Sequence, residues 1–394
     1  MSTSTTNPRL RLALVIEDVG MGGGQERVIA ELAPRLAKRH EVHLFCFSAR
    51  DVDLDGVTVH RLRDPRLPLG ARALWFVLAS SLALRPREFD AVLSQGGNTL
   101  RQTAMLAHTG HRERRRTRAK LQRRFGLRSP LRRAWEVLRD GAFVRLEARA
   151  VERCRGRIMT VSRSIKEYFV REFDLDPDGV FVTRNGVDHT VFTPAVRTEA
   201  RPRLRAELGL DEGDFVALFM GGRWYEKALV EVVDALPLTR ERSHLVIVGR
   251  GDRERFEERA EGGGVRDRVT FVPHVDRPQE YFAMADCLVH PNPHEPFGLV
   301  TLEAAACGLP LLAARTGAAL DLVEDGVTGF FVRPEPQEIA AGLDELAADP
   351  ERLRAMGEAA HGRALEFSWD RQAEEIEALL ARFAGAPGED REAS

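Results

Sequence analysis

Ten consecutive residues organise this chain: His294-Glu295-Pro296-Phe297-Gly298-Leu299-Val300-Thr301-Leu302-Glu303. They follow a short apolar run, Cys287 to His290, and they lead into an alanine-rich stretch that Gly308 and Pro310 terminate. This order predicts a strand, a loop and a helix from about Phe297 to Cys307. The unpaired N–H groups of a helix's first turn and the positive end of its dipole point outward together. The stretch therefore predicts an anion-binding site.

The two glutamates of this stretch make the predicted site more specific. At ~1.5 Å per helical residue, Glu295 and Glu303 would lie on the order of 12 Å apart along the helix. That distance is close to the span of a sugar, its diphosphate and the ribose of a nucleotide. Carboxylates could accept hydroxyl hydrogen bonds at both ends, and backbone amides could bind the phosphates between them. The alternative is an amphipathic helix with two unrelated glutamates.

A second strand-to-helix turn supplies the expected positive charge. The apolar run Phe215 to Met220 is followed by Gly221-Gly222-Arg223-Trp224-Tyr225-Glu226-Lys227. Lys227 is one of four lysines in the chain and the sole lysine after residue 195. A forked guanidinium and a compact ammonium four positions apart suit a diphosphate. We therefore expect Arg223 and Lys227 to bind it, an ordinary surface turn being the alternative.

The N-terminal region predicts a doubly wound sheet. The apolar run Leu10 to Ile16 leads to a glycine-rich turn, then to an amphipathic helix ending near Lys38 and to a strand from Glu41 to Phe47. The dinucleotide fingerprint fails here, because Gln25 stands at the third glycine position. A nicotinamide enzyme is therefore disfavoured. Three successive glycines still allow the backbone to approach a ligand closely, although a merely permissive turn would explain them too.

These motifs together resemble those of the retaining glycosyltransferases of the GT-B fold, specifically glycosyltransferase family four. The residues from Glu295 to Glu303 are similar to that family's Glu-x7-Glu signature. Arg184-Asn185-Gly186-Val187-Asp188 resembles its Pro-Asn-Gly-Val-Asp turn, with Arg184 in place of proline. Ala228 stands where the family usually has glycine. The resemblance covers nearly the whole chain, and it is strongest in residues 215–332 and weakest in residues 50–135.

The resemblance implies an α/β fold of two Rossmann-like, doubly wound domains that face each other across a cleft. We expect an acceptor-binding domain over residues 1–195 and a nucleotide-sugar-binding domain over residues 196–366, with the linker near residues 193–202. A helix over residues 367–384 is expected to cross back to the first domain, before a disordered tail at 385–394. The pattern after Gln95 also predicts a helix that reaches His108.

The family resemblance further implies roles for individual residues. Arg223, Lys227 and Glu295 are expected to be catalytic. Glu295 would hold sugar hydroxyls and Glu303 the ribose diol, and His108 would contact the donor sugar unless it is purely structural. The full set of expected substrate-binding residues is Gly22, Gly23, Gly24, His108, Asn185, Gly222, Gly249, His274, Val275, Phe297, Gly298, Leu299 and Glu303.

The expected reaction transfers a glycosyl unit, with retention, from a nucleotide-diphosphate sugar to a glycan, a glycolipid or a small-molecule acceptor. A UDP-sugar is the expected donor, and a role in cell-envelope or glycan biosynthesis would follow. No Asp-x-Asp motif lies in a suitable loop, so no metal ion or other cofactor is expected to be required. The alternatives are an epimerase or phosphorylase of the same fold, or a non-catalytic sugar- or membrane-binding module.

Charge is distributed unevenly along the chain. Residues 1–195 hold 35 Lys+Arg against 22 Asp+Glu, whereas the remainder holds 23 against 38. Within the basic half, residues 111–133 contain 11 Lys+Arg and a single acid, Glu113. We expect this stretch to be a solvated loop or exposed helix, or else to contact an anionic membrane or a phosphate-bearing acceptor. Nucleic acid is not expected, because no recognised nucleic-acid module accompanies the stretch.

Cysteine usage and hydropathy indicate the compartment. The four cysteines are far apart and none has metal-ligand spacing, so they are expected to be reduced core residues. The longest apolar run, Ala73 to Leu84, is too short to span a bilayer. The expected location is the cytoplasm, with peripheral attachment to the inner face of the membrane as a further expectation.

Overall fold

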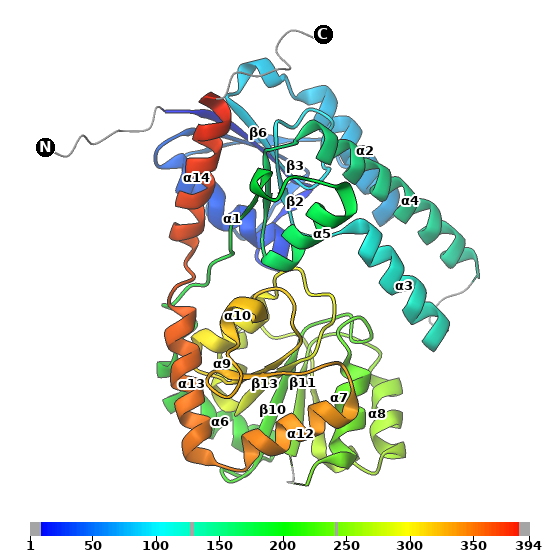
Figure 1. Ribbon diagram of the computed structural model, residues 1–394, viewed down its shortest axis with the longest axis vertical. Helices are drawn as coiled ribbons and strands as arrows, with labels where there is room; N and C mark the ends of the chain where they lie inside the picture. The colour runs from blue at the N-terminus through cyan, green and yellow to red at the C-terminus, as the bar shows by residue number, and fades with distance from the viewer. Residues whose placement is uncertain (1–8, 127–129, 241–242, 386–394) are drawn as a thin grey trace, which may run out of the picture. The chain divides into compact units, whose positions relative to one another are not determined.

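Apolar runs of five or six residues form the central strands of two parallel sheets, as expected for strands that are covered on both faces. The computed structural model describes residues 9–126, 130–240 and 243–385, which form two α/β units (Figure 1). The first unit comprises the described residues of Met1–Arg116, Gly126–Gly186 and Trp369–Ser394. The second comprises those of Thr117–Phe125 and Val187–Ser368.

The sheet of the first unit has seven strands in the order β5-β3-β1-β6-β7-β8-β9, all parallel. A short parallel pair, β2 with β4, lies beyond the ends of β1 and β3. The strands are β1 (Arg11–Val15), β2 (Asp18–Val19), β3 (Glu41–Cys46), β4 (Ser48–Ala49), β5 (Val57–Arg61), β6 (Ala91–Gln95), β7 (Ala104–Ala107), β8 (Ile158–Thr160) and β9 (Val180–Val182).

Helices connect most of these strands, and α1 and α5 bury apolar side chains in the unit. Ser162 caps α5, because its hydroxyl accepts a hydrogen bond from the backbone N–H of Ile165. The helices of the first unit are α1 (Gly24–Ala37), α2 (Leu69–Ala83), α3 (His111–Phe125, shared with the second unit), α4 (Pro130–Arg153), α5 (Arg163–Phe173) and α14 (Trp369–Gly385), with short 3-10 turns at Pro86–Glu88 and Pro177–Gly179.

The sheet of the second unit has six parallel strands in the order β12-β11-β10-β13-β14-β15. In chain order this arrangement is 3-2-1-4-5-6, which is the strand order of a dinucleotide-binding Rossmann sheet. The strands are β10 (Phe215–Met220), β11 (Ser243–Val248), β12 (Val269–Val272), β13 (Cys287–His290), β14 (Leu311–Ala313) and β15 (Gly329–Phe331).

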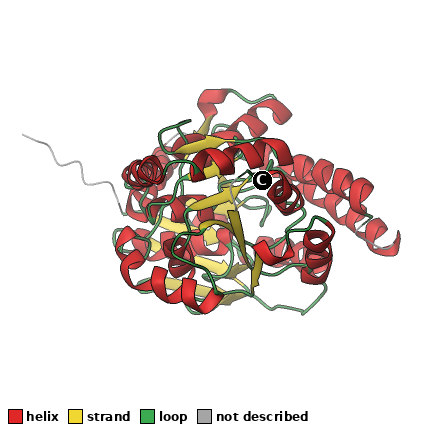
Figure 2. Ribbon diagram, turned by 90° about the horizontal axis from the view of Figure 1, so that it is seen from below, coloured by secondary structure: helices red, strands yellow, loops and turns green. Residues whose placement is uncertain are grey.

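Helices cover both faces of this second sheet, as Figures 1 and 2 show. One side carries α7, α8 and α12, and the other carries α6, α9, α10 and α13 (Figure 1). The helices are α6 (Arg197–Leu208), α7 (Leu229–Ala235), α8 (Arg253–Gly262), α9 (Pro278–Met284), α10 (Leu299–Ala306), α11 (Ala319–Leu322), α12 (Pro336–Ala347) and α13 (Pro350–Ala364), with 3-10 turns at Pro194–Val196, Leu236–Leu238 and Arg266–Arg268.

Each sheet has a point where the strand order reverses. In the first unit it lies between β1 and β6, and in the second between β10 and β13. Loops leaving the carboxyl ends of two such strands diverge to opposite faces, so ligands of doubly wound folds bind there. The loops after β10 and β13 hold Lys227 and Glu295, and those after β1 and β6 hold the glycine-rich turn and the residues that follow Gln95.

Three sequence-based expectations differ from the structure. The segment before His108 is the strand β7 and not a helix, because it pairs with β6 and β8. The expected linker is largely helical, since α6 begins at Arg197 and contains Pro202. The boundary between the units falls after Gly186 and not after residue 195, because Phe192 packs on Phe282 of the second unit.

The helix α14 belongs to the first unit, although it follows the second unit in sequence. It packs on α1, where Asp370 accepts a hydrogen bond from Arg35 at 2.8 Å and Glu377 forms an ion pair with Arg39 at 3.3 Å. Its buried side includes Ile376 and Leu380. The chain therefore leaves the first unit, builds the second, and returns.

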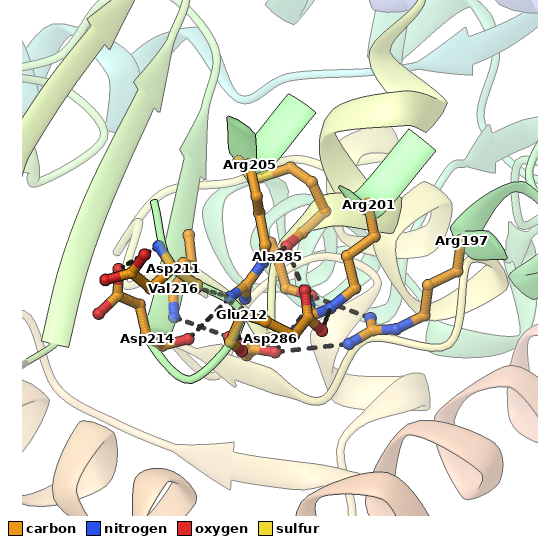
Figure 3. Close-up of polar contacts among 10 residues, drawn as sticks. Arg197, Arg201, Arg205, Asp211, Glu212, Asp214, Val216, Ala285 and Asp286 are labelled. Carbon is orange, nitrogen blue, oxygen red and sulfur yellow. Dashed lines mark hydrogen bonds and ion pairs between the residues drawn. The ribbon is translucent and has the colours of Figure 1, made fainter. Parts of the chain in front are cut away.

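A buried ion cluster holds α6 against the start of β13 (Figure 3). Arg205, with 2 % of its side chain exposed, donates to Asp286 at 2.7 Å and to the backbone carbonyl of Met284. Arg201 reaches the second oxygen of Asp286 at 3.0 Å. Arg205 also donates to the carbonyls of Asp211, Glu212 and Asp214, which satisfies the buried guanidinium.

Candidate functional site

The turn after β10 is strained where it presents its cations. Gly221 has φ +132°, and Arg223 and Ala228 adopt φ +54° and +60° although neither is glycine. Non-glycine residues at positive φ cost stability, and such strain gathers at functional turns. The turn folds Lys227 back over Gly221, so that a Cβ on Gly221 would lie 3.3 Å from the lysine Nζ. Arg223 is exposed and pairs with Glu226 at 3.3 Å.

The loop after β13 carries the acidic part of the site. Its conformation is set by short local bonds: the Asn292 side chain accepts from the N–H of His294 at 3.1 Å, and Thr316 donates to the carbonyl of Asn292 at 2.8 Å. Gly317 (φ +54°) packs against this loop so closely that a Cβ would lie 2.3 Å from the carbonyl oxygen of Phe297. The loop is therefore fixed from its own side and from the turn after β14.

Three hydrogen-bonding groups converge on one oxygen of Glu295. Lys227 Nζ lies 3.1 Å, Asn292 Nδ2 2.7 Å and His290 Nε2 3.0 Å from Glu295 Oε2. Among the residues that the structure describes, no hydrogen bond is made to Oε1 of the same carboxylate. The side chain is only 14 % exposed. The hydrogen bonds to Oε2 thus hold the carboxylate in place, and Oε1 stays available to a ligand hydroxyl.

The charges of this group support each other. Burial raises the pKa of Glu295, but Lys227 and His290 outweigh burial, and the net pKa lies far below the ordinary value. The pKa of His290 is lowered, first by burial and then by Lys227. At neutral pH the carboxyl group of Glu295 is therefore ionised and the imidazole of His290 is neutral. His290 then donates from Nε2, and its Nδ1 is buried without a partner among the described residues.

The start of α10 differs from the expected helix. The helix runs from Leu299 to Ala306, and Gly298 precedes it with φ +82°. Glu295 therefore lies in the loop before the helix. The expected separation of Glu295 and Glu303, which assumed helical rise between them, does not apply. A Cβ on Gly298 would lie 2.8 Å from Cγ of Glu295, so glycine is required here for shape as well as for φ. Glu303 is buried inside α10.

The other expected residues of the second unit lie at the carboxyl ends of neighbouring strands. Gly249 (φ +137°) follows β11, and a Cβ there would lie 2.4 Å from the carbonyl oxygen of Gly221. Gly222 follows β10, and the half-buried Val275 and the exposed His274 follow β12. These positions share one edge of the sheet with Glu295, but no described hydrogen bond joins His274 to the Glu295 group.

In the first unit, the glycine-rich turn is open. Gly22, Gly23 and Gly24 all lack positive φ, and a Cβ on Gly22 would meet nothing within 4 Å. At Gly23 a Cβ would meet the Glu26 carboxylate, the end of a flexible side chain. Neither φ nor packing inside this unit demands glycine at Gly22.

A carboxylate cluster beside this turn was not predicted from sequence. Arg72 donates to Asp18 at 2.6 Å and to Asp64 at 2.9 Å, and it lies 3.5 Å from Glu17. Glu17 lies two residues after Val15, the last residue of β1. Burial, opposed by Arg72, raises the pKa of Glu17 to about 7. The turn is therefore bordered by a carboxyl group that changes charge near neutral pH.

Buried polar side chains without partners among the described residues follow or end strands at the same edge of this sheet. In the described residues, both amide atoms of Gln95, Nε2 of His108 and the hydroxyl of Thr183 have no hydrogen-bond partner. Gln95 pairs in register with Leu106, two residues before His108, so both side chains project from the same face. Burial lowers the pKa of His108 to about 3, so its imidazole is neutral. Buried polar groups left unpaired are costly and imply a water or ligand partner.

Asn185 has a defined structural partner. Its side chain accepts a hydrogen bond from Gln372 Nε2 of α14 at 2.8 Å. Gln372 also donates to the carbonyl of Thr183 at 3.3 Å. The turn that resembles a family motif is thus tied to the returning helix. Its place after β9 keeps it at the carboxyl edge of the first sheet.

Sequence reasoning marked some of these residues as site candidates and did not mark others. Arg223, Lys227 and Glu295 were marked by residue type and by their place after predicted strands. His290, Asn292, Glu17 and Gln95 were missed. Each of these four residues ends or follows a strand beside a switch point. A polar side chain at the end of an apolar run is the sequence signal that could have identified them. Within the described residues, no cluster of three or more His, Cys, Asp or Glu is arranged to hold a metal ion.

The basic stretch at residues 111–133 is mostly helical. Residues 111–125 form α3, the stretch continues into α4, and residues 127–129 lie outside the described residues. Part of its charge is neutralised within the first unit, since Arg112 and Arg116 both pair with Glu172. Among the described helices, none is long and apolar enough to cross a membrane.

Comparison with known proteins identifies relatives of this chain. The family model for glycosyl transferases group 1 matches residues 200–363, and that for glycosyltransferase family 4 matches residues 22–191. An uncharacterized glycosyltransferase of Methanocaldococcus jannaschii is 32% identical over 226 residues, which is 56% of this chain and 58% of the relative. A D-inositol 3-phosphate glycosyltransferase of Geodermatophilus obscurus is 36% identical over 241 residues, or 57% of this chain and 51% of the relative. The chain thus spans just over half the length of these curated relatives.

Solved structures show the same fold. WaaG, a glycosyltransferase involved in lipopolysaccharide biosynthesis, superposes with a TM-score of 0.75 at 19% identity, covering 93% of this chain and 99% of WaaG. HepE of Anabaena, in complex with UDP and glucose, superposes with a TM-score of 0.72 at 19% identity, covering 95% and 100%. The fold is therefore GT-B, with two parallel-sheet α/β domains. Because the two family models account between them for most of both units, the chain belongs to glycosyltransferase family four.

Proposed function

We propose that this chain transfers a glycosyl unit from a nucleotide-diphosphate sugar, most simply a UDP-sugar, to a hydroxyl-bearing glycan, lipid-linked or small-molecule acceptor, with retention of anomeric configuration. The observation that carries the proposal is the Glu295 carboxylate, with one oxygen held by Lys227, Asn292 and His290 and the other unengaged. A fixed, ionised carboxylate is suited to accept hydrogen bonds from sugar hydroxyls. The solved HepE complex with UDP and glucose supports this class of donor.

The chemical demand is to stabilise negative charge on the departing diphosphate. The bond from the anomeric carbon to the phosphate oxygen breaks, and a bond from that carbon to the acceptor oxygen forms on the same face. The acceptor proton passes to the departing phosphate oxygen, so atoms and charge balance without a separate base. Lys227, Arg223 and the N–H groups beginning at Gly298 and Leu299 would hold the diphosphate. On this proposal the chain itself supplies the positive charge, and no metal ion or cofactor is required.

Acceptor recognition is assigned to the first unit. The open glycine-rich turn and the unpaired Gln95 and His108 lie at the carboxyl edge of its sheet, where ligands of doubly wound folds bind. The relatives named as D-inositol 3-phosphate glycosyltransferases suggest a cyclic polyol as one acceptor to test. We further propose a cytoplasmic enzyme of cell-envelope or glycan biosynthesis, with the basic stretch 111–133 attracting an anionic membrane surface.

Glu295→Gln tests the proposed function with little change in shape. We expect kcat for glycosyl transfer to fall roughly 10²–10³-fold, because a neutral amide holds the sugar and its developing charge less well. UDP binding, measured by calorimetry, should change much less. The exposed Glu358→Gln variant is the matched control. Full activity in Glu295→Gln would refute this role, and a product formed from nucleotide sugar and water alone would favour an epimerase of the same fold instead.

A further inference from the structure

The side chain of Asn292 is held in one amide orientation. Its Oδ1 accepts a hydrogen bond from the backbone N–H of His294 at 3.1 Å, and its Nδ2 donates to Glu295 Oε2 at 2.7 Å. An N–H group can only donate and an ionised carboxylate can only accept, so a flipped amide would lose both bonds. Asn292 is buried, and its own loop therefore directs a neutral N–H donor at Oε2.

His290 is restricted to one tautomer by the same carboxylate. Its Nε2 lies 3.0 Å from Glu295 Oε2, so Nε2 carries the proton. A proton on Nδ1 instead would be buried without a partner among the described residues, and Nε2 would turn a lone pair toward the carboxylate. The His290 side chain is 3 % exposed, and its ring centroid lies 6.4 Å from that of Phe219. The ring therefore presents a second neutral donor from a packed position.

The backbone of both residues is tied to the end of β14. The N–H of Ala314 donates to the carbonyl of His290 at 3.3 Å, and the hydroxyl of Thr316 donates to the carbonyl of Asn292 at 2.8 Å. Among the described residues, Thr316 makes no hydrogen bond to Glu295 itself. The link from Thr316 to Glu295 is therefore indirect and passes through Asn292.

The three donors to Oε2 differ in how a substrate affects them. Lys227 is charged, and on the proposed function its ammonium also meets the diphosphate. His290 and Asn292 carry no charge at neutral pH, so a phosphate does not draw them from the carboxylate. We infer that His290 and Asn292 are positioning residues of the transfer reaction, which keep Oε1 of Glu295 toward the donor sugar while the ammonium turns to the phosphates. This inference rests on the proposed function, and Thr316 shares the role through Asn292.

Asn292→Asp reverses the polarity of one donor without changing its shape. The bond from the N–H of His294 is retained, but at neutral pH a second carboxylate faces Glu295. Lys227 and His290 are the other groups that reach the same oxygen. Like charges raise the pKa of one member of such a carboxylate pair. We expect kcat at neutral pH to fall roughly 10²-fold. The ratio of this kcat to that of the unaltered protein should rise as pH is lowered, because a protonated carboxyl can again donate to Oε2.

His290→Phe and His290→Gln separate the donor from the packing. Phenylalanine fills the buried site without an N–H, whereas the glutamine amide can still donate to Glu295. We expect His290→Phe to lower kcat roughly 10–100-fold, with little change in the dissociation constant of UDP, and His290→Gln to restore most of kcat. A residue that only packs would give the opposite order, because phenylalanine preserves the ring. The matched control is His244→Phe, near the amino end of β11, which should keep its activity.

Thr316→Val removes the hydroxyl that holds the carbonyl of Asn292 and keeps the shape of the side chain. We expect a loss of kcat that is smaller than in Asn292→Asp, with unchanged UDP affinity, and Thr316→Ser should restore kcat. Thr270→Val is the control, because it removes a hydroxyl that contacts His244 on the neighbouring strand and not the loop of Glu295. The melting temperature of each variant shows whether a loss of activity reflects unfolding.

Two kinetic results would overturn the inference. One is a His290→Gln protein as impaired as His290→Phe, and the other is an Asn292→Asp protein whose kcat relative to the unaltered protein does not depend on pH. Nitrogen NMR of the full chain adds a test that needs no activity: the ring of His290 should be neutral and protonated on Nε2, with and without UDP. A ring protonated on Nδ1 would contradict the inference even if transfer is normal. Absence of transfer from any nucleotide sugar by the unaltered protein, with the Nε2 tautomer present, would instead count against the proposed function.

Discussion

The ammonium of Lys227 and the carboxylate of Glu295 are in direct contact, each from a loop after a strand beside the switch point of one sheet. The contact ties the expected phosphate-binding turn to the expected sugar-binding loop. In the absence of substrate, each group partly neutralises the other's charge. A sugar diphosphate would meet both, its phosphates at the ammonium and its hydroxyls at the unengaged carboxylate oxygen. The pair is thus pre-organised within one unit.

Lys227→Met tests this electrostatic coupling. Lys227 lowers the pKa of His290 while Glu295 raises it, so loss of the ammonium should raise the pKa of His290. We expect the ring to take up a proton nearer neutral pH and partly replace the lost partner of Glu295. NMR titration of the histidine ring measures this shift, and Lys38→Met, an exposed lysine of the first unit, is the control. An unchanged His290 titration in Lys227→Met would show that the two charges are not coupled.

Glu17→Gln should change how stability depends on pH. Burial raises the pKa of Glu17 from 4.5 to about 7 in the folded protein. Its contribution to stability is therefore fully present below pH 4.5 and is lost as pH rises through about 7. Glutamine cannot ionise, so the variant should be more stable than the unaltered protein at pH 8, by about 1–3 kcal/mol, and equal to it near pH 4.

Denaturant unfolding of the first unit at both pH values measures the Glu17→Gln effect. The exposed Glu167→Gln on α5 is the control and should follow the unaltered protein. A Glu17→Gln variant with the same pH dependence as the unaltered protein would show that Glu17 titrates normally. A loss of acceptor affinity in this variant, with stability gained, would place Glu17 in the acceptor site.

The residues of the site differ in how far sequence could identify them. Lys227 stood out because lysine is rare in this arginine-rich chain, and Glu295 because of its spacing from Glu303. His290 and Asn292 could not be assigned, because their role depends on which oxygen of Glu295 they reach. Gln95 and His108 share a face only through the register of β6 with β7. Register is a tertiary property that a single sequence does not display.

At the scale of elements, β7 shows where local propensity misleads. Ala104, Met105, Leu106 and Ala107 all favour a helix, and a helix was predicted there. The same residues form a fully buried strand between β6 and β8, because the sheet needs an apolar strand at that place. The central strands β1 and β10 were predictable, since their longer apolar runs are flanked by glycine-rich turns. For the short segment of β7, pairing with the neighbouring strands outweighs the local helix propensity.

The packing of α6 depends on one buried arginine. Arg205→Ala should lower the free energy of unfolding of the second unit by about 3–5 kcal/mol, because Asp286 would lose a partner and stay buried. Arg197, which is more exposed and reaches Asp286 at 3.4 Å, is the matched control on the same helix face. Arg197→Ala should cost about 1 kcal/mol or less.

Denaturant unfolding followed through the buried Trp224 would report on the second unit in both arginine variants. Equal losses of unfolding free energy in Arg197→Ala and Arg205→Ala would show that burial of the Arg205 guanidinium does not set the strength of its ion pair. Activity of the folded Arg205→Ala protein, measured below its transition, should be close to normal, because the cluster lies at the amino-terminal end of β13 and not at the carboxyl end that carries Glu295.

For the whole molecule, the order of the chain has a consequence for folding. The first unit is built from three separated pieces, whereas the second consists of one long piece, Val187–Ser368, and the short segment Thr117–Phe125. The fragment 187–368 retains its complete sheet and the Lys227–Glu295 pair. We therefore expect it to fold alone and to bind UDP, with an affinity measured by calorimetry that is within about tenfold of the full chain's.

The fragment 1–186 should behave differently, because it lacks α14. Without that helix the apolar residues that pack on Ile376 and Leu380 are exposed, and Asn185 loses Gln372. We expect a lower melting temperature and faster proteolysis than for the first unit in the full chain. A synthetic peptide of residues 369–385 should restore protection, and the same peptide with Ile376 and Leu380 replaced by serine should not. If fragment 1–186 proves as resistant as the full chain, α14 is a tether and not part of the first unit's core, and loss of α14 should then leave acceptor binding unchanged.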